Sequence, residues 1–108
     1  MAALTATCAA IEGLTRQLAF EFAPTGVRVN CVRGDAMPDT RTIPLTLAGS
    51  AAIAGVSPEV FAQTLPAPPL GRPVSAADTA ASVAFLLSDA ASATSAQVLS
   101  VASRALAA

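Results

Sequence analysis

Only two short segments of the 108-residue chain, residues 27–32 and 97–101, have the pattern of a β-strand. Both are rich in β-branched residues, and the first alternates apolar and polar side chains. Helices are expected between them, and such a connection within one sheet predicts a parallel pair with a right-handed crossover. Two parallel strands leave open edges and cannot cover helices by themselves. The sequence therefore predicts an α/β fold, the terminal portion of a larger doubly wound parallel sheet that other protein completes.

The first helix is expected over residues 1–24, where apolar side chains recur every three or four positions. Small residues line a nearly opposite face, so we expect this helix to pack on both sides, against a sheet and a second helix. Glu12 and Arg16 are spaced for an ion pair on its surface, and Pro24 ends it. The stripe that we expect to be buried consists of Leu4, Cys8, Ile11, Thr15, Leu18 and Phe22.

Two capping patterns mark later helices. Ser57 followed by proline predicts the start of a short helix that ends near residue 65. Ser75 and Asp78 fit a capping box that opens a helix over residues 75–88. Residues 33–65 otherwise lack clear periodicity and are interpreted as a variable loop region, typical of a functional or mobile segment. We expect residues 1–108 to form a single, partial domain.

The composition excludes several classes of function. Six basic and seven acidic residues give a net charge of −1, so the chain has no basic stripe for nucleic acid and no polybasic patch for a membrane surface. It has no histidine and only two cysteines, which indicates no metal site and no disulfide framework. No run of eighteen apolar residues predicts a transmembrane span. A cytoplasmic location is expected. Only 12% of the residues are charged, about half of the usual share, which indicates that much of the surface faces other protein.

Several stretches of the chain, in this order and spacing, resemble the C-terminal part of the short-chain dehydrogenase/reductase family. They are AAIEGLTRQLA at 9–19, GVRVNCV at 26–32, PLGRP at 69–73, FLLSD at 85–89 and QVLSV at 97–101. The resemblance covers nearly the whole chain. It implies a Rossmann-type sheet and an NAD(P)-dependent oxidoreductase lineage.

The same resemblance implies that the catalytic pair of the family is replaced. The family uses a tyrosine for proton transfer and a lysine one helical turn later, and the aligned positions hold Leu4 and Cys8. The chain contains no tyrosine, and its six glycines are too scattered to form the pyrophosphate-binding turn. Asp35 adds a negative charge where the family loop approaches the cofactor. We therefore expect no catalytic residue and no cofactor in the chain by itself, and NAD(P) only when the missing half completes it.

Several residues have two interpretations. Cys8 is either a reactive thiol near a helix N-terminus or a small buried hydrophobe. Asp35 and Asp39 are either a paired carboxylate site or solvated loop residues. Met37 and Thr40 are either the remnant of a nicotinamide pocket, as the resemblance suggests, or structural loop residues. Two further polar residues, Asn30 and Arg72, are expected to be structural.

Two hypotheses of function follow. The first is a segment that is inactive by itself and either acts through packing of the first helix on another chain, a second copy or a family partner, or is a truncated remnant with no activity of its own. The alternative is part of an NAD(P)-dependent, 3-oxoacyl-reductase-like oxidoreductase whose nucleotide-binding half and catalytic residues lie elsewhere. Residues 36–65, the variable loop, carry no pattern that identifies a substrate.

Overall fold

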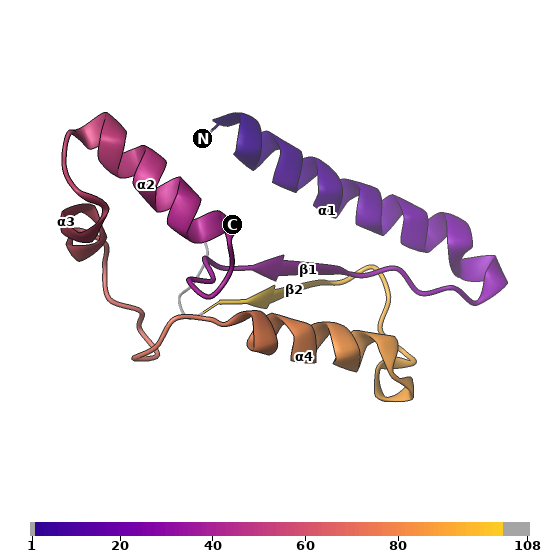
Figure 1. Ribbon diagram of the computed structural model, residues 1–108. Helices are drawn as coiled ribbons and strands as arrows, with labels where there is room; N and C mark the ends of the chain where they lie inside the picture. Colours follow the sequence, from indigo (N-terminus) through magenta and orange to yellow (C-terminus); the bar gives the residue numbers. More distant parts are fainter. Residues whose placement is uncertain (1, 103–108) are drawn as a thin grey trace. The chain divides into compact units, whose positions relative to one another are not determined.

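The computed structural model describes residues 2–102, which form six helical segments and two strands (Figure 1). In chain order these are α1 (Ala2–Phe22), the 3-10 turn η1 (Ala23–Thr25), β1 (Cys31–Gly34), α2 (Thr42–Ala54), α3 (Pro58–Gln63), α4 (Ala76–Leu87), the 3-10 turn η2 (Asp89–Ala91) and β2 (Val98–Val101). The expected order of helix, strand, short helix, helix and strand is present, and α2 is an addition to it.

Strands β1 and β2 pair with each other in a sheet of two strands. The N–H of Cys31 donates to the carbonyl of Gln97 at 2.9 Å, and the N–H of Ala96 donates to the carbonyl of Val29 at 2.8 Å. Because N–H groups alternate in direction along a strand, that of Val32 points away from β2. Within residues 2–102, the edge of β1 that holds Val32 therefore has no neighbouring strand.

The chain divides into two compact units, each described by itself. The first comprises the chain up to Arg33 together with Ala80–Ser100; α1 lies on one face of the strand pair and α4 on the other (Figure 1). The second comprises Gly34–Thr79 and, of the described residues, Val101 and Ala102. The buried residues are mostly small: Thr15, Ala19, Leu86 and Ala91 in the first unit and Ala51 and Val74 in the second. In the described part of the chain, neither unit buries a large hydrophobic cluster of its own.

The first strand begins four residues later than residues 27–32 predicted, at Cys31. The residues before it combine the backbone bond between Ala96 and Val29 with side-chain bonds: the N–H of Val29 donates to Ser95 Oγ, and Asn30 Nδ2 donates to the carbonyl of Thr94. The Oδ1 of Asn30 also accepts the N–H of Gln97. Asn30 thus has the backbone-bonding role that its position predicted. The second strand begins at Val98, one residue later than expected.

The interpretation of residues 33–65 as a loop region with one short helix was incomplete, because it contains a second helix, α2. This helix is almost entirely apolar or small and has a single buried residue, Ala51, so no amphipathic pattern marks it. Gly55 ends it in the left-handed conformation, φ 71°, and donates its N–H to the carbonyl of Ala52. Helix α3 begins as predicted, with Val60 N–H donating to Ser57 Oγ at 3.3 Å.

The expected burial of the α1 stripe is wrong for most of its length. Leu4 is 59% exposed, Ile11 is 50% exposed and Cys8 is exposed, whereas Thr15 and Ala19 are buried. The described chain covers only one side of α1, toward its C-terminal half, so the first turns have nothing to pack on.

The expected ion pair between Glu12 and Arg16 is also replaced. Glu12 Oε1 instead accepts from Arg33 Nη1 at 3.0 Å, which ties α1 to β1 within the first unit. The Nε atom of Arg33 is buried and has no hydrogen-bond partner among the described residues. The carboxylate of Glu12 is thus bonded to Arg33 of β1 and not to Arg16 of its own helix.

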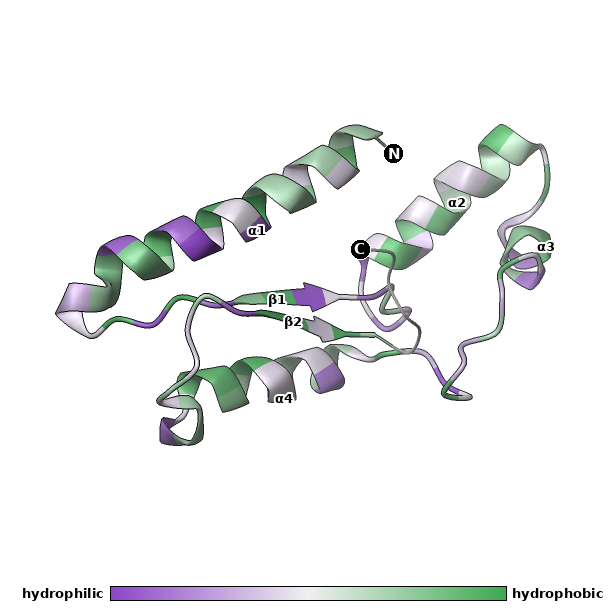
Figure 2. Cartoon of the chain, turned by 180° about the vertical axis from the view of Figure 1, so that it is seen from behind, coloured by the Kyte–Doolittle hydropathy of each residue, from purple (hydrophilic) through white to green (hydrophobic). Residues whose placement is uncertain are grey.

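The capping box of α4 forms as predicted, at the hydrophilic first turn of a helix that is hydrophobic toward its other end (Figure 2). Asp78 N–H donates to Ser75 Oγ at 3.1 Å, and Ser75 N–H donates to Asp78 Oδ2 at 2.9 Å. Arg72 adds a bidentate pair to Asp78, at 2.6 and 3.1 Å, and so anchors the turn as expected. The Arg72 guanidinium first, and then the N–H and hydroxyl of Ser75, hold the pKa of the Asp78 carboxyl well below its usual range.

We expect Asp78→Asn to lower the stability of the protein at neutral pH and to flatten its dependence on acid. Because the folded-state pKa of Asp78 is depressed, its contribution is present above the unfolded value of about 3.9 and is lost as the pH falls below it. Urea unfolding at about pH 7 and about pH 3 measures both effects. Asp89→Asn, at an exposed carboxylate, is the control. An unchanged pH dependence in Asp78→Asn would contradict the assignment.

Candidate functional site

The loop that carries Met37 and Thr40 is bonded to itself and to the first turn of α4. Thr40 donates both its N–H, at 3.0 Å, and its Oγ1, at 2.7 Å, to the carbonyl of Met37. The Sδ of Met37 accepts from Thr79 Oγ1 at 3.2 Å. These contacts all lie within the second unit and give both residues a structural role in closing the loop. Whether they also line a cofactor pocket stays a prediction.

The carboxylates of Asp35 and Asp39 serve different backbone groups. Both oxygens of Asp39 accept the N–H of Ala76, at 3.1 and 3.0 Å, and so cap the N-terminus of α4 across 37 residues of chain. Asp35 Oδ1 accepts the N–H of Ala36 at 2.8 Å. This arrangement favours the structural interpretation over an acid/base pair. Among residues 2–102 there is no group of three or more potential metal ligands.

A cavity of about 320 Å³ lies between α2 and α3, in the second unit. Its walls are apolar except for one carboxylate, and they consist of Pro38, Ile43, Pro44, Leu47, Pro58, Glu59 and Ala62. Concave, largely apolar sites with few polar groups are typical of small-molecule binding. The sequence pattern missed this cavity because one of its two walls is α2. Three prolines within 21 residues were the available signal, since they fix the backbone of a cavity wall.

Glu59, in the first turn of α3, is the charged residue of that lining. Its own backbone N–H and the Ser57 hydroxyl lower the pKa of its carboxyl from the ordinary value. The side chain is exposed, so its charge acts on whatever approaches the cavity through solvent. The lining therefore combines apolar side chains with one exposed carboxylate.

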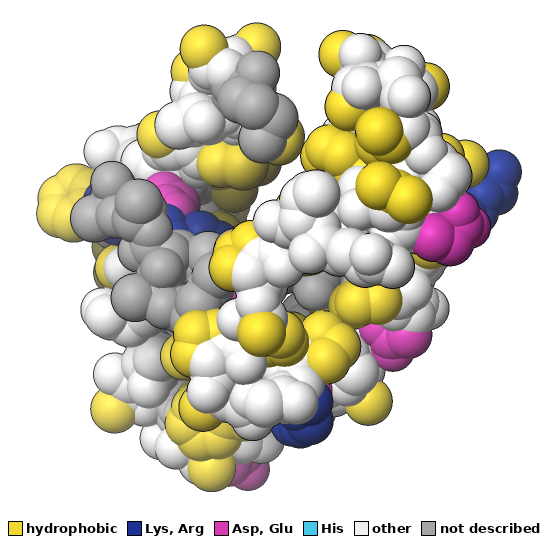
Figure 3. Space-filling model, turned by 90° about the vertical axis from the view of Figure 1, so that its left-hand side faces the viewer, with side chains coloured by type: hydrophobic (Ala, Val, Ile, Leu, Met, Phe, Trp, Pro, Cys, Tyr) yellow, Lys and Arg dark blue, Asp and Glu magenta, His cyan; other side chains and the backbone are white. Residues whose placement is uncertain are grey.

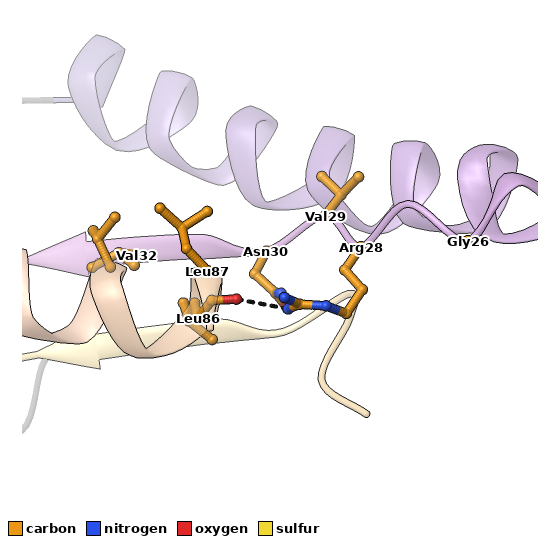
Figure 4. Close-up of a pocket in the computed structure, with 8 residues that line it drawn as sticks. Gly26, Arg28, Val29, Asn30, Val32, Leu86 and Leu87 are labelled. Atoms are coloured by element: carbon orange, nitrogen blue, oxygen red, sulfur yellow. Dashed lines mark hydrogen bonds between the residues drawn. The ribbon is translucent and has the colours of Figure 1, made fainter. Parts of the chain in front are cut away.

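A second cavity, of about 570 Å³, lies in the first unit between β1 and α4 (Figure 4). Arg28 reaches across it to the C-terminus of α4, where Nη1 donates to the carbonyl of Leu86 at 2.7 Å (Figure 4). The same guanidinium donates to the carbonyls of Thr94 at 3.3 Å and Ser88 at 3.5 Å. The remaining walls are mainly apolar, with Val32 and Leu87 among them.

Leu4 and Cys8 lie one turn apart on α1, in the first unit, at exposed positions. They face the same side of the helix, as the family's tyrosine and lysine do in the resemblance. Leucine has no group that transfers a proton, and the thiol of Cys8 carries no positive charge. That these two positions correspond to the catalytic pair of the family stays a prediction. Met37 and Thr40 belong to the other unit.

Comparison with known proteins gives a consistent set of matches. The sequence model described as enoyl-(acyl carrier protein) reductase matches residues 1–103. The 2-(S)-hydroxypropyl-CoM dehydrogenase 3 of Xanthobacter autotrophicus is 43% identical over 89 residues, which are 82% of this chain and 33% of that protein.

Solved structures with the same arrangement include levodione reductase, at TM-score 0.74 and 31% identity over 86% of this chain and 35% of that one. A variant of actinorhodin polyketide ketoreductase with NADPH gives TM-score 0.75 and 32% identity over 86% of this chain and 36% of that one. The chain spans about a third of the length of these relatives. No helix within residues 2–102 is both long and apolar enough to cross a membrane.

Proposed function

The chain belongs to the short-chain dehydrogenase/reductase family, and from this membership we propose that it is a substrate-side segment, inactive by itself, that packs against a nucleotide-binding half. That half lies outside residues 1–108. The expected fold class, the C-terminal portion of a Rossmann-type doubly wound sheet, is confirmed by the structural relatives. The chain is thus an oxidoreductase-like segment, and its inactivity is the proposal.

The observation that carries this proposal is the two-stranded sheet with an open edge and little buried apolar surface. Among residues 2–102, fifteen large hydrophobic side chains are at least 39% exposed, including Phe20 and Leu87 at 78% each. Hydrophobic side chains are visible over much of the face shown in Figure 3. Exposed apolar surface on this scale marks a protein interface. We propose that the open edge of β1 receives a strand of the other half.

Helix α1 offers a second surface of the same kind. Leu4, Ile11 and Leu14 are each at least half exposed on it, at 59, 50 and 56%. We propose that this surface contacts a second copy of the chain or a family partner, and that nucleic acid and membranes are not partners. The two cysteines, neither in a disulfide, support a reducing, cytoplasmic location within the same proposal.

The residues of this chain do not by themselves fit a nicotinamide nucleotide. A relative was solved with NADPH, but here Leu4 has no proton to transfer and Cys8 carries no positive charge. The carboxylate of Asp35, directly after β1, is negatively charged and would repel the phosphate groups of the nucleotide. NAD(P) belongs to the proposal only for a complex in which the other half supplies the phosphate-binding turn.

The alternative is a working part of an NAD(P)-dependent oxidoreductase of the 3-oxoacyl-reductase kind. The identity of 43% to a dehydrogenase and the apolar cavity between α2 and α3 favour it. The two candidates differ in whether an assembled complex turns substrate over.

Co-expression with the N-terminal two-thirds of the Xanthobacter relative, the part that this chain does not match, tests the proposal. We expect a defined complex by size-exclusion chromatography, NAD(P)H binding by the complex, and none by the 108-residue chain. Micromolar binding of NADH or NADPH by the chain by itself, or failure to form the complex, would contradict the proposal. Turnover by the complex would favour the alternative.

We expect the double variant Leu4→Tyr, Cys8→Lys to show no turnover as a 108-residue chain. Both side chains would return to one helical face, but the phosphate-binding turn would still be missing. NADH oxidation with a panel of ketones measures this, with the unmodified chain as the control. Measured turnover above that control would overturn the account of this segment.

A further inference from the structure

We propose that the first unit binds a small organic phosphate, an apolar group that carries a terminal phosphate, in a cavity of about 450 Å³ at the C-terminal end of α1. All residues that line this cavity belong to the first unit. The inference goes beyond the proposed function and does not rest on it. The side chains that offer contacts are Arg16, Phe20, Val27, Arg28, Ser92 and Ser95.

The cavity lies at the amino ends of the two strands. Residues 26–28 of its lining precede β1, and the lining residues between 92 and 96 precede β2. Both segments lie at the end of the sheet opposite to the arrowheads in Figure 1. In doubly wound sheets, nucleotides and substrates bind beyond the carboxyl ends of the strands. A ligand of this cavity is therefore neither the nucleotide nor the substrate of an oxidoreductase.

Two arginines give the cavity its charge. The carboxylate of Glu12, one turn from Arg16, is bonded to Arg33 instead, so Arg16 forms no salt bridge within residues 2–102. The guanidinium of Arg28 is fixed by three backbone carbonyls, which are neutral groups, and in the described part of the chain it too lacks a carboxylate partner. The lining contains no acidic residue. An anion thus meets two guanidinium groups whose charge no carboxylate neutralises.

Two hydroxyl groups complete the polar wall. Ser95 Oγ accepts the N–H of Val29 at 3.1 Å, which leaves the hydroxyl hydrogen to donate. Ser92 follows η2, and its side chain is exposed. The donors come from α1, from the segment before β1 and from the segment before β2. Donors from three directions suit the three terminal oxygens of a phosphate better than a planar carboxylate.

The apolar part of the lining defines the other end of the ligand. Phe20 lies one helical turn after Arg16 and is 78% exposed, and Val27 is 50% exposed. An aromatic ring or a short chain attached to the phosphate removes this surface from water and so gains free energy. Inorganic phosphate lacks such a group, so we expect an organic phosphate to bind more tightly.

The test titrates the 108-residue chain with phenyl phosphate, inorganic phosphate and phenol at low ionic strength. Calorimetry gives the affinities, and NMR shifts of the Ser95 and Ala96 amides give the location. We expect phenyl phosphate to bind at least about threefold more tightly than inorganic phosphate and at least about tenfold more tightly than phenol. Arg16→Gln should weaken its binding by at least about threefold. Phe20→Ala should lower it to the affinity of inorganic phosphate. The control Arg41→Gln, an equal loss of charge in the second unit, should leave it unchanged.

The outcomes separate the parts of the proposal. Absence of phenyl phosphate binding, or equal affinities in Arg16→Gln and Arg41→Gln, would overturn the site. Phenol that binds as tightly as phenyl phosphate would overturn its anionic character, and inorganic phosphate that binds as tightly would overturn its apolar part. Shifts confined to amides outside the lining would overturn the location. Arg16 and Phe20 are exposed, so both variants are expected to keep the fold. No measurement needs the nucleotide or the other half, so failure to form the complex described above would not affect the result.

Discussion

Arg28→Ala is expected to lower the free energy of unfolding by about 2 kcal/mol, because one guanidinium serves three backbone carbonyls. Those carbonyls belong to the C-terminus of α4 and to the connection that leads into β2. They would lose a charged donor that also complements the helix dipole. The hydrogen bonds join residues that are 58 to 66 positions apart in the sequence. The variant therefore also removes a link between the N-terminal and C-terminal segments of the first unit.

Urea unfolding followed by circular dichroism measures this change. Arg28→Lys should recover only part of the stability, because the ammonium group of lysine cannot bond several separate carbonyls at once as the planar guanidinium of arginine does. Arg41→Ala, at an exposed arginine before α2, is the control and should stay within about 0.5 kcal/mol of the parent chain. A similarly small effect for Arg28→Ala would show that the three hydrogen bonds contribute little.

Val32→Pro is expected to weaken association with a nucleotide-binding half by at least tenfold, about 1.4 kcal/mol or more. Proline removes the N–H that points away from β2 and places its ring where a neighbouring strand would approach. The bonds between β1 and β2 use the N–H of Cys31 and of Asp35 instead, so the existing pair keeps its donors. Titration of the complex by fluorescence or calorimetry provides the measurement.

Ser100→Pro is the matched control for this experiment. The carbonyls of Gln97 and Val101 accept from β1, so by alternation Ser100 presents its N–H to the opposite edge of the sheet. It should leave the association unchanged if the other half joins at β1. Equal loss in both variants would indicate general damage to the sheet, and a loss confined to Ser100→Pro would place the interface on β2.

Local patterns predicted the parts of this fold that depend on neighbouring residues. Ser75 and Asp78 are three positions apart in the sequence, and the geometry of their hydrogen bonds follows from the first turn of the helix alone. The same holds for the cap at Ser57. Arg72 was correctly expected to anchor a turn, although its partner Asp78 could not be read from the sequence.

The missed parts depend on contacts that a sequence pattern does not contain. Helix α2 packs on α3 through small apolar groups, so it lacks the stripe by which a surface helix is detected. The late start of β1 follows from side-chain bonds of Asn30 to residues more than sixty positions away. The α1 stripe was expected to be buried because its apolar side chains recur with the helical period. That period does not show whether other residues of the same chain cover the stripe, and here Leu4 and Cys8 are exposed.

The division of the first unit between both ends of the sequence has a consequence for synthesis on the ribosome. Arg28 finds its carbonyl partners only when residues 86–94 have emerged, at about 5–20 residues per second. Helix α1, with its exposed apolar side chains, therefore waits several seconds without the rest of its unit. In that interval the side chains of Thr15 and Ala19, which the completed unit buries, remain exposed to solvent, so the unit can form only after most of the chain has emerged.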